Sequence, residues 1–409
     1  MEVAAHANVK KRHGRRCPCE NGAFGGTSQP DSSLRYSIEV HDHDTRPSRS
    51  ADVGKMSQIK ARMAASNVRV LDLCCGMGGL SVAAREMGMT VVAGVDVNPS
   101  ALRTFSKNFT EAEAIEGSVQ TRTVLKRCRA LLDGEGDGQY IRIVLSGPPC
   151  QGFSAAGSRD PKDRRNGVLV AVARAIAKIQ PDCALIENVS TVLADKHGDR
   201  LESFRQALAD GNYHVEKIVL DSAHFGVPQK RKRVFFFVTR QPLEYDRILD
   251  LLERHKVPPV TTREALHGLP SPAVRPDIYD DEAEVDGPTN HFAMRHSVRV
   301  MKKIAAISPG TGPMSYRRLH PVRPANTLFS GHRAPPAHFE EPRSITVREA
   351  ARLQGFPDTF RVYGSFANQM EQVTNAVPPP LARVVLCVLA EAFGLEYGMG
   401  ALRQGVKQW

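Results

Sequence analysis

Ile141-Arg-Ile-Val-Leu-Ser-Gly-Pro-Pro-Cys-Gln-Gly-Phe-Ser154 is the stretch that decides the fold. Its first five residues are mostly apolar and indicate a buried parallel strand. Gly147 and two prolines end that strand sharply, so Cys150 is expected just beyond a strand's carboxyl end. Open α/β sheets bind ligands at that edge, where a thiol is a candidate nucleophile. The alternative is a small buried hydrophobe, as expected for Cys183 and Cys387, but the Pro-Pro and Gln-Gly neighbours of Cys150 disfavour it.

A second motif lies upstream and combines a strand, a glycine-rich turn and a helix. Val68–Cys74 is the expected strand, and Cys75-Gly-Met-Gly-Gly-Leu80 is a turn into a helix that begins near Ser81. Such a turn lets a ligand approach the backbone and directs helix N–H groups at it. The next expected strand, Thr90–Val95, ends at Asp96, where a carboxylate can bind ribose hydroxyls. The pattern fits a nucleotide-like cofactor, and its glycine spacing disfavours a nicotinamide dinucleotide.

With both motifs in view, the chain resembles the cytosine-5 DNA methyltransferases from about Val68 to near Phe393. Its glycine-rich turn, Asp72-Leu-Cys-Cys-Gly-Met-Gly-Gly79, is similar to the family's S-adenosyl-L-methionine loop, and Pro148-Pro-Cys-Gln-Gly-Phe-Ser154 is similar to its nucleophile loop. The other matches, in the family's order, are Ile186-Glu-Asn-Val189, Gln229-Lys-Arg-Lys-Arg233, Arg323-Pro-Ala-Asn-Thr-Leu328 and Asn375-Ala-Val-Pro378. Six motifs in one order make the resemblance specific.

The resemblance implies a DNA (cytosine-5-)-methyltransferase that flips its target cytosine out of the duplex. The catalytic residues it implies are Cys150, Glu187, Arg231 and Arg233. Cys150 would attack the ring at C6, and Glu187 would donate to N3 from the end of a strand. The two arginines would bind the cytosine carbonyl or a flanking phosphate through forked hydrogen bonds. Taken alone, Glu187 would be read as a loop carboxylate and the arginines as a solvated basic face.

The same resemblance implies the residues that bind S-adenosylmethionine and DNA. The implied cofactor-binding residues are Asp72, Cys74, Gly76, Gly78, Gly79, Leu80, Asp96, Val97, Ser118, Val119, Pro148, Asn375 and Val377. The implied DNA-binding residues are Gln151, Ser154, Asn188, Arg231 and Arg233. Asn188 is also expected to brace the turn that follows Glu187, and the alternative for Asn375 is an ordinary turn residue.

Four positions depart from the family's pattern around the adenosine. Cys74 replaces a phenylalanine that lies against the adenine, and Ser118 replaces an aspartate that meets the adenine amino group. Asp96 replaces a longer glutamate that reaches the ribose, and Asn98 replaces an aspartate. Because the catalytic motifs are intact, we expect weakened cofactor binding rather than lost chemistry.

Composition and charge agree with an enzyme that acts on nucleic acid. The 409 residues include 55 lysines and arginines against 44 acidic residues, a formal charge of +11 that suits a polyanionic partner. No run approaches the roughly 18 apolar residues of a membrane span, and no apolar leader follows Met1. The eight cysteines lack the paired spacing of a zinc site, so no metal is expected. We expect a monomeric, cytoplasmic, nucleoid-associated bacterial protein that binds double-stranded DNA, with a cognate restriction endonuclease as a candidate partner.

The order of apolar segments predicts an α/β fold, with a Rossmann-like, mainly parallel sheet and helices on both faces. Residues 1–65 read as a disordered basic tail, and residues 66–240 as the catalytic and S-adenosylmethionine-binding domain. The resemblance places a smaller target-recognition lobe at 241–318, before 319–409 return to the first domain. Helices are expected at Ala101–Asn108, Thr121–Leu132, Gly167–Gln180, Arg200–Ala209, His296–Ile307 and Leu381–Phe393, and after the capping box of Thr346 and Glu349.

The expected recognition lobe and the reaction leave several questions open. Arg295, Arg299, Arg317 and Arg318 are candidates for contacts with phosphates or guanine edges. An RNA (tRNA) cytosine-5 methyltransferase of the same fold could use the same cysteine and glutamate. A catalytically silent DNA-binding regulator would leave the intact catalytic residues unexplained. An amino-methyltransferase is disfavoured, because its pattern has an aromatic residue where Cys150 lies.

Overall fold

The computed structural model describes residues 67–135, 140–149, 167–276, 281, 287–313, 316–329 and 335–392. All of them belong to one compact unit that spans residues 51–409. The predicted tail at 1–65 lies outside the described residues, as do the predicted nucleophile Cys150 and its neighbours Gln151 and Ser154. The structure describes the other predicted catalytic residues, Glu187, Arg231 and Arg233, and all the predicted cofactor-binding residues.

A seven-stranded sheet forms the centre of the protein, in the order β3-β2-β1-β4-β5-β8-β6. Its strands are β1 (Val68–Leu73), β2 (Thr90–Asp96), β3 (Glu113–Glu116), β4 (Ile141–Ser146), β5 (Cys183–Val189), β6 (His214–Asp221) and β8 (Lys232–Thr239). The first five strands of the chain pair in parallel, whereas β8 runs antiparallel to both of its neighbours. The prediction of a mainly parallel sheet is therefore confirmed.

The strand order reverses at β1, which pairs with β2 on one side and with β4 on the other. In open α/β sheets this reversal leaves a crevice beyond the carboxyl ends of the two strands. The segments that leave β1 and β4 at this edge are the glycine-rich turn and the Gly147-Pro-Pro turn. The fold thus brings together the two motifs that were most informative in the sequence.

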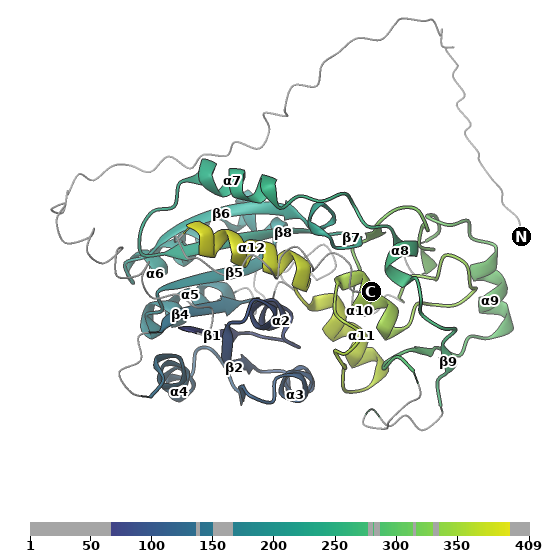
Figure 1. Cartoon of the computed structure of the whole chain (residues 1–409), viewed down its shortest axis with the longest axis horizontal. Coiled ribbons are helices and arrows are strands. Elements are labelled where there is room, and N and C mark those ends of the chain that lie inside the picture. Colours follow the sequence, from purple (N-terminus) through teal and green to yellow (C-terminus); the bar gives the residue numbers. More distant parts are fainter. Residues whose placement is uncertain are drawn as a thin grey trace, which may run out of the picture. The chain divides into compact units, whose positions relative to one another are not determined.

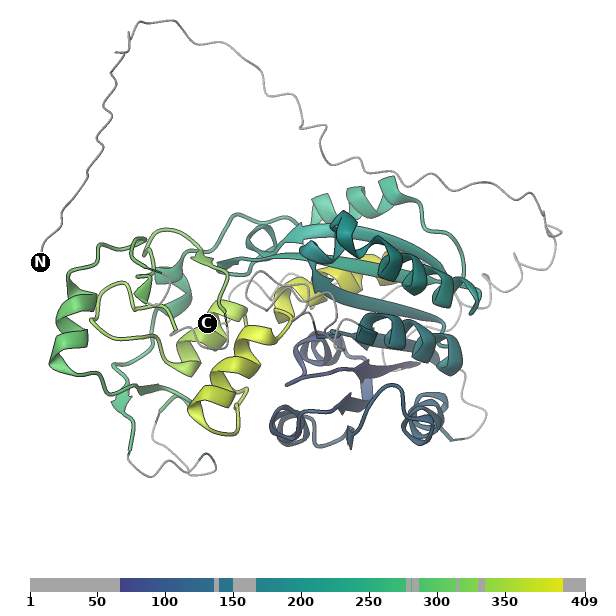
Figure 2. The same cartoon turned by 180° about the vertical axis from the view of Figure 1, so that it is seen from behind.

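Helices cover both faces of the sheet, as predicted. One face buries apolar residues of α4 (Arg122–Asp133), α5 (Val168–Ile179) and α6 (Gly198–Ala209). The other face buries those of α2 (Gly79–Glu86), α3 (Pro99–Asn108), α7 (Tyr245–Arg254) and α12 (Pro379–Ala392). Figures 1 and 2 show the sheet from opposite sides, with α12 in front of it in Figure 1. The four helices predicted between residues 101 and 209 are confirmed, with ends that differ from the prediction by at most two residues.

The second part of the fold is the segment between α7 and α12, which holds short elements. These are α8 (Thr262–Leu266), β9 (Ala273–Val274), β10 (Phe292–Ala293), α9 (Val298–Ala305), β11 (Ala325–Asn326), α10 (Val347–Gln354) and α11 (Phe366–Asn375). β11 pairs in parallel with β7 (Gln229–Lys230), which lies just before β8. The predicted capping box is confirmed, because Thr346 Oγ1 accepts from the Glu349 amide and the Glu349 side chain accepts from the Thr346 amide. Gly355 ends α10 in the left-handed region at φ 85°.

One stretch of the chain, Phe366–Ala392, has the length and hydropathy of a membrane span. It consists of two helices, α11 and α12, and most of it is buried inside the protein. Core helices of folded domains satisfy the same criteria. In α12 the buried residues, which include Leu381, Val385 and Leu389, join the core that covers the sheet.

Candidate active site

The glycine-rich turn holds the amino end of α2 against the C-terminal segment of the chain. A Cβ atom on Gly79 would lie 2.3 Å from the carbonyl oxygen of Val377, so only glycine allows this approach. Gly78 precedes the helix at φ 97°, and a Cβ atom there would lie 2.6 Å from the ring of Phe109. Gly79 therefore fixes Val377 next to the turn, whereas Gly78 serves the packing of α2 on α3.

Asp72 is buried at the end of β1 with one oxygen satisfied. Its Oδ2 accepts a hydrogen bond of 2.7 Å from Ser81 Oγ in α2. Its Oδ1 has no hydrogen-bond partner among the described residues. Burial raises the pKa of this carboxyl to about 7, against the opposing hydrogen bond from Ser81 and with a further contribution from the charge of Asp96. A carboxyl in this state is suited to a cationic or hydrogen-bond-donating ligand.

Asp96 ends β2 and fixes the loop that follows it. Its Oδ2 accepts from the Gly76 amide and its Oδ1 accepts from the Asn98 amide, both at 2.8 Å. Asn98 in turn caps α3, because its Oδ1 accepts from the amides of Ser100 and Ala101. Both oxygens of Asp96 thus already hold the backbone, although each keeps a lone pair for a ligand.

These groups line one cavity of about 1080 Å³. Of the thirteen predicted cofactor-binding residues, all but Gly78 line it, including Cys74, Leu80, Val97, Ser118, Val119, Pro148 and Asn375. The same cavity is lined by Glu187, Arg231 and Arg233, the three predicted catalytic residues that the structure describes. The predicted cofactor-binding and catalytic residues therefore share one continuous space.

The turn that leads to the predicted nucleophile is fixed from both sides. Ser146 Oγ donates to the carbonyl oxygen of Leu73 at 2.8 Å, which ties the end of β4 to the end of β1. Asn188 Nδ2 donates to the carbonyl oxygen of Pro148 at 3.3 Å. The expectation that Asn188 braces a turn fits this contact. Its predicted DNA contact has no support here, because the residue is only 1% exposed and does not line the cavity.

Glu187 and Arg233 form a buried pair on neighbouring antiparallel strands. Glu187 lies opposite Phe235, and Arg233 lies opposite Val189, so the two charged residues are diagonal neighbours on one face. Arg233 Nε lies 2.7 Å from Glu187 Oε1, and Glu187 is 7% exposed. Burial raises the pKa of Glu187, while the charges of Arg233 and Arg231 oppose the increase. The carboxyl can therefore hold a proton more readily than a solvated glutamate.

Arg231 connects this pair to the C-terminal segment. Its Nη2 donates to the carbonyl oxygen of Ala376 at 3.3 Å, and the residue is 2% exposed. Just before it, Gln229 donates to Leu353 and Gln354 of α10 and accepts from the Leu328 amide. Motifs that are about a hundred residues apart in the sequence thus meet at one wall of the cavity.

The described cysteines differ from a catalytic thiol. Burial raises the pKa of Cys74 and of Cys75 far above the usual range, and the nearby carboxylates Asp72 and Asp96 add to the effect. Cys183 is buried in the sheet and Cys387 in α12, as predicted for core residues. The Cys74 and Cys75 thiols therefore keep their protons and are poor nucleophiles.

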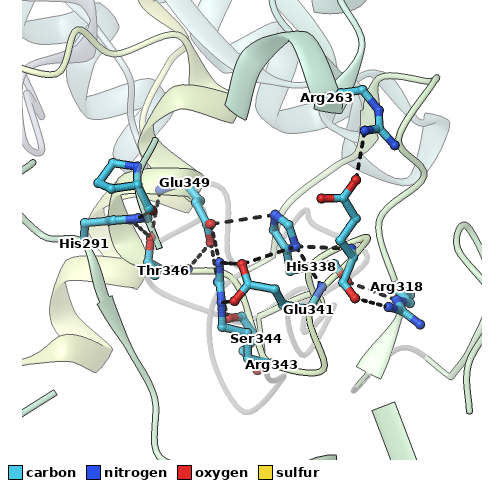
Figure 3. A network of polar contacts seen from close by, with 11 residues as sticks. Arg263, His291, Arg318, His338, Glu341, Arg343, Ser344, Thr346 and Glu349 are labelled. Atoms are coloured by element: carbon cyan, nitrogen blue, oxygen red, sulfur yellow. Dashed lines mark hydrogen bonds and ion pairs between the residues drawn. The ribbon is translucent and has the colours of Figure 1, made fainter. Parts of the chain in front are cut away.

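The second part of the fold contains a buried network of charged groups (Figure 3). Arg343 donates to both oxygens of Glu349 at 2.8 Å, and the same guanidinium binds Glu341. Arg318 donates to the carbonyl oxygens of Ile307, His338 and Glu340. These bonds give Arg318 a structural role, and its DNA contact stays a prediction. Arg295, Arg299 and Arg317 are exposed, and their DNA contacts stay predictions.

Some cavity residues were missed from the sequence. Asn368, Glu371 and Gln372 on α11 line the cavity together with the predicted Asn375. Their spacing places them on one helical face, and this polar pattern was the available signal. Ser81, the partner of Asp72, was named only as the start of a helix.

Comparisons with known proteins agree with this geometry. The family described as C-5 cytosine-specific DNA methylase matches residues 68–390. The type II methyltransferase M.XorII of Xanthomonas oryzae pv. oryzae is 31% identical over 353 residues, covering 77% of this chain and 82% of the relative. M1.HphI of Haemophilus parahaemolyticus is 28% identical over 332 residues, with 77% and 84% covered.

Solved structures show the same fold. A prophage-encoded E. coli protein, assigned as a DNA modification methyltransferase, has a TM-score of 0.64 and 26% identity, covering 80% of this chain and 99% of its own. The S. pombe Dnmt2 methyltransferase has a TM-score of 0.55 at 17% identity, covering 79% and 98%. The matched family favours DNA over the RNA alternative. The chain therefore belongs to the C-5 cytosine-specific DNA methylases and is a DNA cytosine methyltransferase.

Proposed function

We propose that the enzyme transfers a methyl group from S-adenosylmethionine to C5 of a cytosine that is flipped out of duplex DNA. The observation that carries this proposal is the shared cavity. Its wall contains the glycine-rich turn, the Glu187–Arg233 pair, and Pro148 and Pro149 immediately before Cys150. A cofactor held at the turn and a base held at the pair would meet beside the predicted nucleophile.

The residues of the cavity fit S-adenosylmethionine. Asp72 has a buried, unpartnered Oδ1 in the cavity wall, which suits the ammonium group of the methionine part. Asp96 retains acceptor capacity for the ribose, as the end of β2 does in nucleotide-binding sheets. When bound, S-adenosylmethionine supplies a methyl group made electrophilic by its sulfonium. The departures at Cys74 and Ser118 lead us to expect weaker binding of the adenine than the family's usual residues would give.

Cys150 has the role of nucleophile in this proposal. Cytosine C5 is a weak nucleophile, and addition of the Cys150 thiolate to C6 would form a sulfur–carbon bond and break the C5–C6 double bond. The displaced electron pair makes C5 reactive enough to take the methyl group. A base then removes the C5 proton, the double bond forms again and the cysteine leaves as a thiolate.

Glu187 assists this addition from the N3 side of the ring. Its raised pKa favours a carboxyl that donates a proton or hydrogen bond as charge builds on the ring. Arg233 holds the carboxyl in place through Oε1, and Arg231 is fixed to the turn at Ala376. The arginines also bring positive charge to the place where the base would enter.

The DNA must present its cytosine outside the stack, because C5 and C6 are not accessible to both reactants inside a duplex. Flipping costs a few kcal/mol, which phosphate contacts elsewhere must offset. The formal charge of +11 supports such contacts. Because relatives are named type II methyltransferases, we further propose that the enzyme protects DNA alongside a cognate restriction endonuclease, as a monomer in the bacterial cytoplasm.

Bisulfite sequencing of DNA from cells that express the protein tests the activity, the methylated position and the sequence context together. We expect methylated cytosines at one recurrent sequence with the wild type and none with Cys150→Ala. Cys128→Ala, which removes a buried thiol of α4 that does not line the cavity, is the matched control and should leave methylation intact. Methylation that persists in Cys150→Ala would overturn the proposed mechanism.

A further inference from the structure

One face of α11 turns polar side chains towards the cavity. Asn368, Glu371, Gln372 and Asn375 follow the spacing of a single helical face, and all four line the cavity. The opposite side of the helix packs into the apolar core through Met370 and Val373. A helix that keeps its polar face towards a cavity of this size is placed to hold a polar ligand.

Gln372 is the member of this face with an unsatisfied atom. Its Nε2 donates to the carbonyl oxygen of Tyr363 at 2.8 Å and to Ser100 Oγ at 3.2 Å, which fixes the orientation of the amide. The residue is 6% exposed, and its Oε1 is buried without a hydrogen-bond partner among the described residues. A buried acceptor in this state costs free energy until a donor reaches it.

The contact with Ser100 places Gln372 at the cofactor end of the cavity. Ser100 lies in the first turn of α3, which begins directly after the loop that Asp96 holds through the Asn98 amide. Asp96 is the residue expected to meet the ribose, and it is shorter than the family's usual glutamate. Both of its oxygens also hold backbone amides. A second acceptor at this end of the cavity would offset that shorter reach.

We propose that Gln372 Oε1 accepts a hydrogen bond from a ribose hydroxyl of the cofactor. Gln372 is then an additional cofactor-binding residue supplied by α11, the helix that also carries the predicted Asn375. The proposal rests on the proposed function, because it requires S-adenosylmethionine or its product to bind in this cavity.

Isothermal titration calorimetry with S-adenosylhomocysteine tests the proposal without relying on turnover. Gln372→Met keeps the length and volume of the side chain but removes the acceptor, and we expect roughly tenfold weaker binding. Gln369→Met is the matched control. Gln369 lies on the same helix, is also buried and donates to the Gly364 carbonyl oxygen at 2.9 Å, but it does not line the cavity. Its substitution should change binding by less than about twofold.

A further measurement separates the contact from a structural effect. The 2′-deoxy and 3′-deoxy analogues of S-adenosylhomocysteine should each bind the wild type more weakly. For one of the two analogues, Gln372→Met should cause no further loss of affinity, because the analogue lacks the hydroxyl that Gln372 would bind.

The outcomes distinguish this proposal from the one on which it rests. A wild-type protein that does not bind S-adenosylhomocysteine would overturn the proposed use of the cofactor, and this contact with it. If the wild type binds but Gln372→Met and Gln369→Met weaken binding equally, the cofactor site stands and the role of Gln372 is wrong. The role is also wrong if removing either hydroxyl weakens binding to Gln372→Met by the same factor as it weakens binding to the wild type.

Discussion

Asp72→Asn tests whether burial in the cavity wall raises the pKa of the Asp72 carboxyl. Asp72 is fully buried, its Oδ2 accepts from Ser81, and its Oδ1 has no partner among the described residues. Burial raises the pKa from 3.8 to about 7. In the unfolded chain the same carboxyl titrates near its ordinary value. Between pH 4 and 7 the folded protein therefore holds a proton that the unfolded chain has released.

The sign of the effect on stability follows from proton binding. Because the folded state binds more protons in this window, the free energy of unfolding falls as the pH rises. The stabilisation is fully present below about pH 4 and is lost above about pH 7. A pKa difference of roughly three, at about 1.4 kcal/mol for each pH unit, gives about 4 kcal/mol in total. About 2.5 kcal/mol of this lies between pH 5 and pH 8.

Asparagine cannot ionise, so Asp72→Asn should lack this pH dependence. Urea denaturation of the ligand-free protein, followed by circular dichroism at pH 5, 6, 7 and 8, measures it. Between pH 5 and pH 8, we expect the free energy of unfolding of the variant to rise by about 2.5 kcal/mol relative to that of the wild type. Glu202→Gln, whose side chain is 69% exposed, is the control and should follow the wild type. If the free energies of unfolding of Asp72→Asn and the wild type differ by an amount that is constant within about 0.5 kcal/mol from pH 5 to pH 8, the reasoning is refuted.

Three further predictions concern the cavity. Gly79→Ala should weaken S-adenosylhomocysteine binding more than tenfold and lower the unfolding temperature, because its Cβ would clash with Val377 O at 2.3 Å. Gly198→Ala, at the first position of another helix with open space around it, should have neither effect. Cys74→Phe should tighten binding of S-adenosylmethionine a fewfold by calorimetry, because a phenylalanine can lie against the adenine. An affinity that is improved by Cys74→Ala but unaffected by Cys74→Phe would contradict this. Glu187→Gln should lower the methylation rate by about a hundredfold or more. The wild-type rate should fall as the pH rises through the raised pKa of Glu187, and the variant should not show this fall. A variant with the same pH–rate profile as the wild type would count against Glu187 as a proton donor.

Much of the fold could be predicted because its signals are local. The apolar run predicted as a strand at Val68–Cys74 is a strand one residue shorter, Val68–Leu73. The run that begins at Ile141 and is ended by Gly147 is the strand Ile141–Ser146. The capping box at Thr346 also depends on residues three positions apart. Such features need no knowledge of the tertiary structure.

The remaining features depend on contacts that a local pattern does not contain. The run at Val234–Val238 predicts a buried strand, but its antiparallel insertion between β5 and β6 is set by connectivity. The ion pair of Glu187 and Arg233 follows from the register of these strands. The polar face of α11 acquires its meaning only when the helix is placed against the cavity.

The covalent bond between Cys150 and cytosine C6 is the central claim, and trapping measures it directly. Duplex DNA that contains 5-fluorocytosine in the methylated sequence is incubated with the enzyme and S-adenosylmethionine, and the product is digested and mapped by mass spectrometry. Because fluorine at C5 cannot leave as a proton does, we predict a stable adduct on the peptide that contains Cys150, and none with Cys150→Ala. Methylation of ordinary cytosine by an enzyme that never forms this adduct, or an adduct on another cysteine, would contradict the account.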